Sequence, residues 1–440
     1  MSELTGCEMP INEIKPFIEA NVNLQLKKHA TARLFMAGAP GCGKSDIMRQ
    51  LCEENNWGLK CVYISNMSLE QLTGIPCKIE AGSEAIWSKP EIFNFSNLDY
   101  RPENYNENDS TTILFLDDIH LADRVFQKYL FQILTYKSLN GYKLPEKCAI
   151  ILAGNRNTDK ALANVIPAPV MNRISVYEVT STSSDWLKNF AFKYGIRDDI
   201  MSFIHAKGDV FLSQEPLENV PWASPRSWTF LSDQMDAYEK SYGNISIDKL
   251  KTIATGLIGI EYANEFIAYR EIFSKWNIDD FIGMTDKDMI SIFEKEINKN
   301  PVAAYAIINA GVTWLLQVVK ENKFDVKNED VIKSAKTLYN IMTNILQVKC
   351  NGCSIKPLVI AGTEYICLYQ NSLNEHAMKL NNCSNNYNFI QIIELFTSFL
   401  ERKSPIDWIY YEILSYIFDV ELTKEELIEI EKAKSKIQIN

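Results

Sequence analysis

The chain has 440 residues, of which 46% are hydrophobic and 23% charged, a balance typical of a folded globular protein and not of a disordered one. Its length exceeds what one hydrophobic core usually supports, so we expect two or three domains. The net charge of -11 at pH 7 argues against a surface built to neutralise phosphates, and we do not expect nucleic acid to be a partner.

The amino-terminal segment, Met1 to Glu13, has no apolar stretch behind a basic start, so we expect no secretory signal and a cytoplasmic protein. The most apolar long segment runs from Ala303 to Val319 and is interrupted by Asn309, Thr313 and Gln317. Because it falls short of the roughly 20 apolar residues that span a bilayer, we interpret it as a buried helix and expect no membrane contact.

Ten cysteines in a chain without a signal peptide favour free thiols in a reducing compartment. Cys350 and Cys353 form a single CxxC, and Cys367 and Cys383 could supply two further zinc ligands. The spacing is irregular and lacks a second close pair, so we favour free or buried thiols over a zinc site.

Short β-rich runs alternate with helical runs between Arg33 and Val179, which indicates a parallel sheet covered by helices. We expect strands at Leu34–Ala37, Leu59–Ile64, Thr112–Leu116, Ala149–Ala153 and Ile174–Val179. A helix with one buried face should follow Asp118, because apolar residues repeat there at i, i+4 spacing. Its two rows are Val125, Tyr129 and Ile133, and Phe126, Leu130 and Leu134.

Strand signals become rare from Trp186 onward and helical periodicity takes over. The small polar segment Ser181–Ser184 therefore predicts a domain boundary. Beyond about Trp276 the pattern stays mostly helical, with one possible strand or loop section between Lys356 and Leu368.

The strongest motif lies between the first expected strand and a helical run. Gly38 to Ser45 reads GAPGCGKS and matches the P-loop pattern GxxxxGK[ST]. Its glycines let backbone N–H groups approach phosphates, Lys44 reaches the β and γ phosphates, and the Ser45 hydroxyl ligates Mg²⁺. The motif predicts binding of ATP with Mg²⁺. The residues expected to contact the nucleotide are Gly38, Ala39, Pro40, Gly41, Cys42, Gly43, Lys44, Ser45 and Asp46.

Two strand ends should supply further polar groups at the same edge of the sheet. Asp117 and Asp118 end the strand Thr112–Leu116; with a P-loop upstream, Asp117 is expected to hold the magnesium and Asp118 to orient or deprotonate the attacking water. Asn155 follows the next strand, where its amide could hold the water near the γ-phosphate. On local grounds, a turn built from Gly and Asn explains this segment equally well.

Taken in order, these motifs resemble those of AAA+ ATPases of the MoxR family, over about Ile11 to Phe273. The resemblance is carried by the P-loop, by Asp117-Asp118 and by three later segments. These read AGNRNTD at Ala153–Asp159, PAPVMNR at Pro167–Arg173 and SPRSW at Ser224–Trp228.

The resemblance implies a role for each of three polar residues. Asn155 would be sensor 1, Arg173 the arginine finger offered to a neighbouring subunit, and Arg226 sensor 2 on a helical lid. A guanidinium suits these places because its planar fork offsets phosphoryl charge. Arg156 is a rival for the finger role, and each arginine taken singly could instead form a surface ion pair.

The fold implied is α/β: a P-loop AAA+ core with a five-stranded parallel sheet and helices on both faces, then an all-α lid and a mostly helical carboxy-terminal region. We assign these parts to residues 1–182, 183–275 and 276–440. The resemblance also places a helix-2 insert near Gly74–Trp87 and a hairpin near Tyr136–Pro145.

The function implied is that of an ATPase acting as a ring, of six subunits in this family, that remodels or activates a protein client. A partner bearing a von Willebrand A domain is the family's usual helper. One departure is Asp118, where such proteins commonly carry the longer Glu. A nucleotide-gated ring scaffold with little or no hydrolysis is therefore the alternative.

Overall fold

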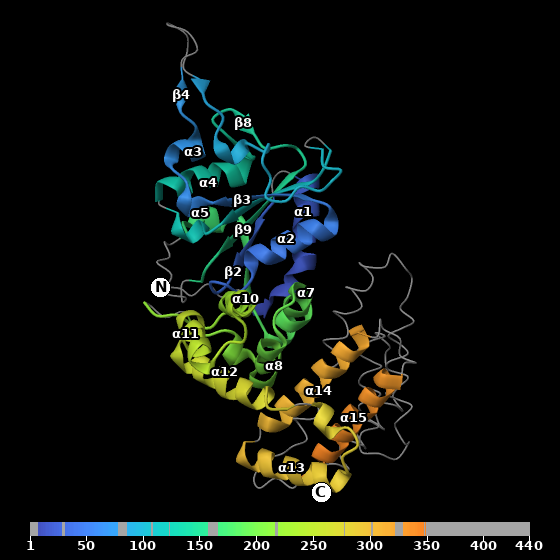
Figure 1. Ribbon diagram of the computed structural model, residues 1–440. Coiled ribbons are helices and arrows are strands. Elements are labelled where there is room, and N and C mark those ends of the chain that lie inside the picture. The colour runs from blue at the N-terminus through green and yellow to red at the C-terminus, as the bar shows by residue number, and fades with distance from the viewer. Residues whose placement is uncertain are drawn as a thin grey trace. The chain divides into compact units, whose positions relative to one another are not determined.

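In the computed structural model of the protein (Figure 1), the described residues are 8–28, 31–77, 86–106, 109–122, 124–156, 166–215, 219–276, 278–300, 302–321, 329–346 and 348. The chain divides into two compact units. The first comprises Met1–Asp185 and Leu212–Trp228, and the second comprises Trp186–Phe211 and the chain from Thr229 onward. Three of the predictions, the CxxC pair, the section Lys356–Leu368 and the motif residues Asn157–Asp159, lie outside the described residues.

A parallel sheet forms the centre of the first unit, with the strand order β1-β10-β2-β9-β6-β3. Every neighbouring pair in it runs parallel. The strands are β1 (Glu8–Pro10), β2 (Arg33–Ala37), β3 (Gly58–Tyr63), β6 (Thr112–Asp117), β9 (Cys148–Gly154) and β10 (Ile174–Thr180).

The sheet has six strands, so the prediction of five was wrong by one, although all five expected strands are present within one residue at each end. The missed strand, β1, has three residues and pairs with the end of β10 at the edge of the sheet. Three residues are too few to show an alternating pattern. Pro10 also reads as a strand breaker, since proline lacks the N–H that a central ladder needs and is tolerated at an edge.

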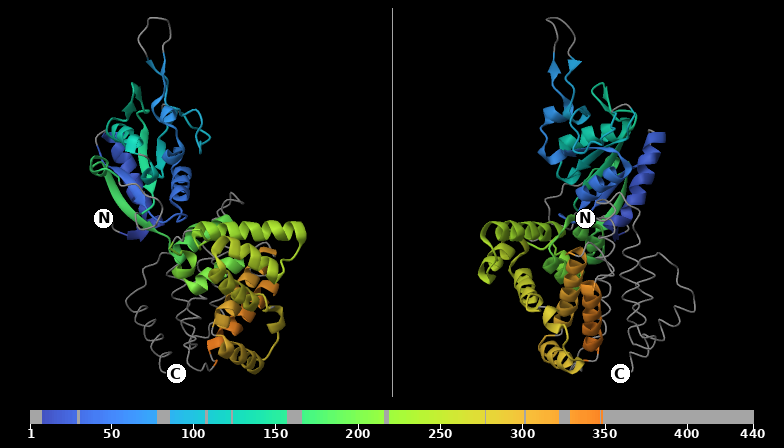
Figure 2. Two further views of the ribbon diagram at one scale, coloured as in Figure 1. Left: turned by 90° about the vertical axis from the view of Figure 1, so that its left-hand side faces the viewer. Right: turned by 45° about the vertical axis from the view of Figure 1, so that its right-hand side comes forward.

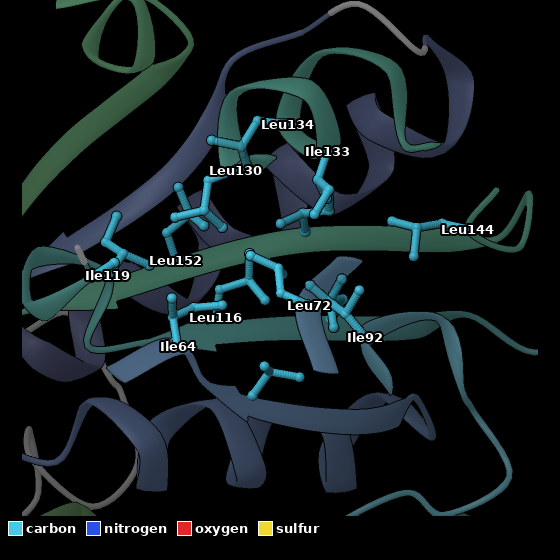
Figure 3. Packing of buried hydrophobic residues seen from close by; sticks show 14 of the residues in the cluster. Ile64, Leu72, Ile92, Leu116, Ile119, Leu130, Ile133, Leu134, Leu144 and Leu152 are labelled. Atoms are coloured by element: carbon cyan, nitrogen blue, oxygen red, sulfur yellow. The ribbon is translucent and has the colours of Figure 1, made fainter. Parts of the chain in front are cut away.

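Helices cover both faces of the sheet, as predicted, and side chains alternate between two cores along each strand. On β6, Ile113 and Phe115 enter the core beneath α1 and α2. Leu114 and Leu116 enter the core beneath α3 and α4, part of which Figure 3 shows. The helices are α1 (Lys15–Lys27), α2 (Lys44–Asn55), α3 (Leu69–Thr73), α4 (Arg124–Tyr136), α5 (Ala168–Met171) and α6 (Ser183–Trp186).

The predicted buried face of α4 is present over most of its length. Leu130, Ile133 and Leu134 are buried, and Phe126 and Tyr129 pack against the same core. Val125 was predicted to join them but is 48% exposed in the first turn of the helix. Short 3₁₀ turns join several elements: η1 (Ile11–Ile14), η2 (Ile64–Asn66), η3 (Glu91–Phe93) and η4 (Ile119–Leu121).

Two β-ribbons occupy the segments where an insert and a hairpin were expected, and Figure 2 shows them from two sides. They are β4 (Pro76–Cys77) with β5 (Ile86–Trp87), and β7 (Ser138–Leu139) with β8 (Tyr142–Lys143). Asn140 and Gly141 turn the second ribbon with φ of 49° and 87°, the left-handed pair of a type I′ turn. The Tyr142 hydroxyl of the second ribbon donates to the Trp87 carbonyl of the first at 2.8 Å, and the Asn140 side chain donates to the carbonyl of Thr73, the last residue of α3, at 2.8 Å.

The second unit is helical throughout its described part. Phe203, Phe266 and Tyr269 meet edge to face in its core. The apolar segment Ala303–Val319 lies in a largely buried helix, as expected, and Asn309 donates a hydrogen bond of 2.8 Å to Ser202. The helices after α6 are η6 (a π-helix, Leu187–Ala191), α7 (Phe192–Tyr194), α8 (Asp198–Lys207), α9 (Asp209–Leu212), α10 (Pro225–Tyr242, which continues from the first unit), α11 (Ile247–Ile258), α12 (Ile260–Phe273), η7 (Ile278–Phe281), α13 (Asp286–Lys299), α14 (Val302–Glu321) and α15 (Glu329–Leu346).

A buried carboxylate ties three of these helices together. Asp199 of α8 accepts hydrogen bonds from Arg197 and from Arg270 of α12, and both arginines also contact Glu239 of α10.

None of the helices in the described part of the chain is long and apolar enough to cross a bilayer. The five described cysteines are free thiols: Cys42, Cys52, Cys61, Cys77 and Cys148.

Candidate nucleotide-binding site

The P-loop connects β2 to α2 and is held against the sheet on two sides. The Gly38 N–H donates to the Gly154 carbonyl at 3.1 Å, and the Ser181 hydroxyl donates to the Cys42 carbonyl at 2.7 Å. Gly43 has a φ of 99° at the N-cap of α2, a left-handed conformation that favours glycine. The loop thus wraps around the amino terminus of α2, the geometry of an anion cradle.

Lys44 is buried, and its ammonium group bridges the loop to the next strand of the sheet. Its Nζ donates to the carbonyls of Gly38 and Ala39 at 2.8 and 3.1 Å, and to Oδ1 of Asn155 at 3.1 Å. Asn155 directly follows β9, so the two residues that the sequence placed at one sheet edge lie in contact there.

Ser45 and Asp117 also meet at this edge, although they are far apart in the sequence. The Ser45 hydroxyl donates to Oδ2 of Asp117 at 2.7 Å, and Asp117 is buried at the end of β6. A hydroxyl beside a carboxylate is the all-oxygen donor set that Mg²⁺ prefers, with phosphates and water completing its octahedron. The residues present therefore fit a Mg²⁺ ion bound together with a nucleotide. The described residues contain no cluster of three or more His, Cys, Asp or Glu that could hold a metal by itself.

Asp118 turns the chain out of β6 with a φ of 56°, a left-handed conformation that is uncommon outside glycine. Its N–H donates to Oδ1 of Asp117 at 2.9 Å. Burial, and then the charge of Asp117, raise the pKa of Asp118, and the cations Lys44 and Arg226 oppose this rise. The raised pKa makes this carboxylate a better proton acceptor than an exposed aspartate would be.

Arg226 lies beside the P-loop at the start of α10. A β-carbon added to Gly41, whose φ is 79°, would lie 3.2 Å from Cβ of Arg226 and 3.1 Å from the Ser224 hydroxyl. Burial raises the pKa of Asp46 in the first turn of α2, and the charge of Arg226 is the main opposing influence. The SPRSW segment therefore packs directly on the phosphate-binding loop.

Arg173 stands apart from this cluster. It lies at the amino-terminal ends of the parallel strands, whereas the cluster lies at their carboxyl ends. It immediately precedes β10, whose first residue pairs with Arg33 at the start of β2, whereas the P-loop follows the other end of β2. Five strand residues at about 3.3 Å each separate the two edges by about 13–17 Å. Its guanidinium donates to the Thr135 hydroxyl at 2.7 Å and to the Pro169 carbonyl at 2.8 Å, and lies 4.1 Å over the Phe131 ring.

Arg156, the rival for the finger role, lies at the same edge as the P-loop. It follows Asn155 and forms an ion pair with Glu8 of β1, with 3.7 Å between Nη1 and Oε1. Arg156 therefore lies at the carboxyl ends of the strands, with Lys44 and Asn155, whereas Arg173 lies at the amino-terminal ends.

Two residues near the site were not singled out from the sequence. Ser181 holds the P-loop backbone, and His120 accepts a hydrogen bond from the Asn155 N–H through Nδ1 at 3.1 Å. The small polar pattern at Ser181 predicted only a domain boundary, and nothing local marks this residue as a support of the P-loop 139 residues away. His120 has a weak signal, since it is a ring nitrogen base three residues after a predicted metal ligand.

The sheet topology and the P-loop define an AAA+ fold. Comparison with known proteins gives a match to one family model. Residues 33–168 match the family model of the AAA domain, dynein-related subfamily. The matched residues all lie within the first unit. No curated protein matches the chain.

Among solved structures, the chain is distantly similar to the RuvB Holliday junction branch migration motor of Thermotoga maritima. The identity is 11% over 60% of this chain and 74% of that one, with a TM-score of 0.32. A variant of the same motor gives 10% identity over the same shares, with a TM-score of 0.33. These values are too low to carry an argument about function.

Proposed function

We propose that the protein binds ATP with Mg²⁺ and hydrolyses it. The observation that carries this proposal is the meeting of three strand ends at one edge of the sheet. The Lys44–Asn155 contact joins the P-loop to β9, and the Ser45–Asp117 contact joins it to β6. P-loop enzymes need this combination of a phosphate-binding lysine, a magnesium-binding hydroxyl and a carboxylate.

Each side chain has a separate task in the proposed reaction. The loop from Gly38 to Asp46 would hold the phosphates, and Ser45 and Asp117 would hold Mg²⁺, which neutralises charge on the phosphate oxygens when bound. Asp118 would take the proton of the attacking water, a task that its raised pKa suits. Asn155 would orient that water, and Arg226 would contribute positive charge beside the P-loop.

The proposed working form is a ring of identical subunits, six in the MoxR-like arrangement that the sequence resembles. Arg173 supports this, because its edge of the sheet is remote from the P-loop of its own subunit and it could complete the site only in a neighbour. We propose that the ring acts in the cytoplasm on a protein client, which could be a von Willebrand A domain protein. In this proposal, residues 1–182 are the core, 183–275 the lid and 276–440 a further helical region.

Asp118 also favours a second candidate, a ring scaffold assembled by nucleotide binding with little hydrolysis. An aspartate is one methylene shorter than the glutamate usual at this place, and the left-handed backbone of Asp118 fixes where its short side chain starts. Binding without turnover would then be the functional event.

Two substitutions test ATP binding and hydrolysis separately. We expect Lys44→Ala to abolish ATP affinity measured by calorimetry, because the loop loses its only lysine. We expect Asp118→Asn to keep ATP affinity and to lower turnover by about 10²- to 10⁴-fold, the usual contribution of a general base. Undiminished ATP binding by Lys44→Ala would contradict the assignment of the P-loop as the nucleotide-binding site. Equal and very slow turnover by wild type and Asp118→Asn would favour the scaffold.

A further inference from the structure

We propose that His120 is a positioning residue for Asn155, and that it acts as a hydrogen-bond acceptor at Nδ1. This inference rests on the proposed ATPase function, because it assigns a support to a residue of the same site. The sequence gives only the weak signal of a ring nitrogen three residues after Asp117, and the role itself follows from a contact between two neighbouring strand ends.

His120 lies in η4, the 3₁₀ turn that follows Asp118 directly, and its side chain is 1% exposed. The Asn155 N–H donates to its Nδ1 at 3.1 Å. Because the donor is a backbone amide, Nδ1 must carry a free lone pair, and in the neutral ring the proton then resides on Nε2. The turn after the β6 carboxylates is thereby joined to the residue after β9.

The backbone at Asn155 needs such a support. β9 ends at Gly154, so the Asn155 N–H lies beyond the last residue that the strand ladder holds. The carboxamide of the same residue accepts a hydrogen bond from Lys44 Nζ. Fixing the backbone of Asn155 therefore fixes where its carboxamide lies relative to Lys44.

Gly154 makes room for the imidazole. A β-carbon added there would lie 2.7 Å from Nδ1 of His120 and 3.1 Å from the ring of Phe35. The first distance is shorter than the non-bonded contacts that Cβ atoms make, so a larger residue would displace the imidazole from the Asn155 N–H. The close approach of His120 to the end of β9 thus depends on a glycine at that position.

The experiment compares His120→Asn with His120→Gln. Oδ1 of asparagine is as many bonds from Cα as Nδ1 of histidine, whereas the acceptor of glutamine lies one bond further and imitates Nε2. We expect both variants to bind ATP within about twofold of wild type. Turnover should stay within about threefold for His120→Asn and fall by about 10- to 100-fold for His120→Gln, the cost of misplacing a group by about 1 Å.

Two results would overturn the proposal: equal turnover by the two variants, or the reverse order, in which Gln is active and Asn is not. Gly154→Ala is an independent variant that should reproduce the glutamine result. Its effect should also be non-additive with His120→Gln in a double-mutant cycle, because both changes act on one contact.

A measurement without turnover separates this proposal from the proposed function. Hydrogen exchange of the Asn155 amide should be slow in wild type and His120→Asn and faster in His120→Gln. If wild type hydrolyses no ATP but the exchange rates follow this order, the ATPase assignment fails while the contact stands. If the Asn155 amide exchanges equally in all three, the positioning role fails whatever the turnover.

Discussion

Asp118 is the residue on which the choice between an ATPase and a scaffold depends. Three features of the structure act on it together: its left-handed backbone, its half-buried carboxylate and the neighbouring charge of Asp117. The last two raise its pKa, which favours proton acceptance, but none of them lengthens the side chain. Asp118 therefore falls short of a glutamate in the length of its side chain, and so in how near its carboxylate comes to the attacking water, and not in its ability to accept a proton.

We expect Asp118→Glu to raise turnover by at least about tenfold, because one added methylene brings the base nearer to the water while the proton-accepting group stays the same. Steady-state ATPase assays at saturating ATP would measure this, with Asp118→Asn as the inactive control. Turnover by Asp118→Glu equal to or below that of wild type would show that reach does not limit the reaction.

Residues inside a contiguous motif could be placed from the sequence, and residues that support them could not. The P-loop, Asp117 and Asn155 were each assigned to one edge of the sheet, and the structure brings them together there. His120 and Ser181 act on backbone groups 35 and 139 residues away. Such contacts depend on how close two strands end in space, and a single sequence carries no pattern for that.

Among the secondary-structure elements, α8 of the second unit carries a partly buried titratable group, His205. Burial lowers the pKa of His205 from its ordinary value of 6.5 to about 4. The folded form therefore binds the proton less tightly than the unfolded form. The neutral imidazole contributes its full stability above pH 6.5, and that contribution is lost as the pH falls from 6.5 toward 4.

We accordingly expect the second unit to lose stability between pH 6.5 and pH 5, by at most about 1.4 kcal/mol per pH unit from this group. His205→Gln, which cannot gain the charge, should show a shallower decline in thermal unfolding over the same range. Comparing the two proteins at each pH removes the contribution of the carboxylates, which both share. Parallel curves would mean that His205 is not responsible.

Whole strands were predicted well because of how they are buried. A strand covered on both faces reads as a short apolar run, and β2, β6 and β9 are buried over their full lengths. β1 escaped prediction because its pattern is exposed at one end and only partly buried elsewhere. The exposed Val125 shows a related limit, since periodicity predicts which residues share a face of a helix but not how far the covering core extends.

For the whole molecule, the remote position of Arg173 predicts that catalysis requires two subunits. Arg173→Ala should retain nucleotide affinity and lose turnover if Arg173 is the proposed finger, because an arginine finger stabilises the transition state and is not needed to hold ATP. Mixing Arg173→Ala with Lys44→Ala, each inactive alone, should restore part of the ATPase activity. The recovery should increase with total protein concentration as rings assemble.

Arg156→Ala is the matched control, since Arg156 lies at the P-loop edge and should not complement Lys44→Ala in the same way. Loss of the Phe131 contact at this half-buried site removes about 0.5–2 kcal/mol of stability, so melting temperatures must accompany the assay. If subunits exchange and no activity returns, the finger is Arg156 or the ring has no part in the reaction.

The strand order has a consequence for how the protein is made on the ribosome. Both neighbours of β2, β9 and β10, come much later in the chain, and the Gln25 carboxamide of α1 pairs with the Ile150 backbone 125 residues away. At about 5–20 residues per second, synthesis of that stretch takes about 6–25 s. Throughout this interval the nascent chain carries the four apolar core residues of β2, Leu34 to Ala37, with no strand to pair with. Its amino-terminal part is therefore open to aggregation until β9 emerges.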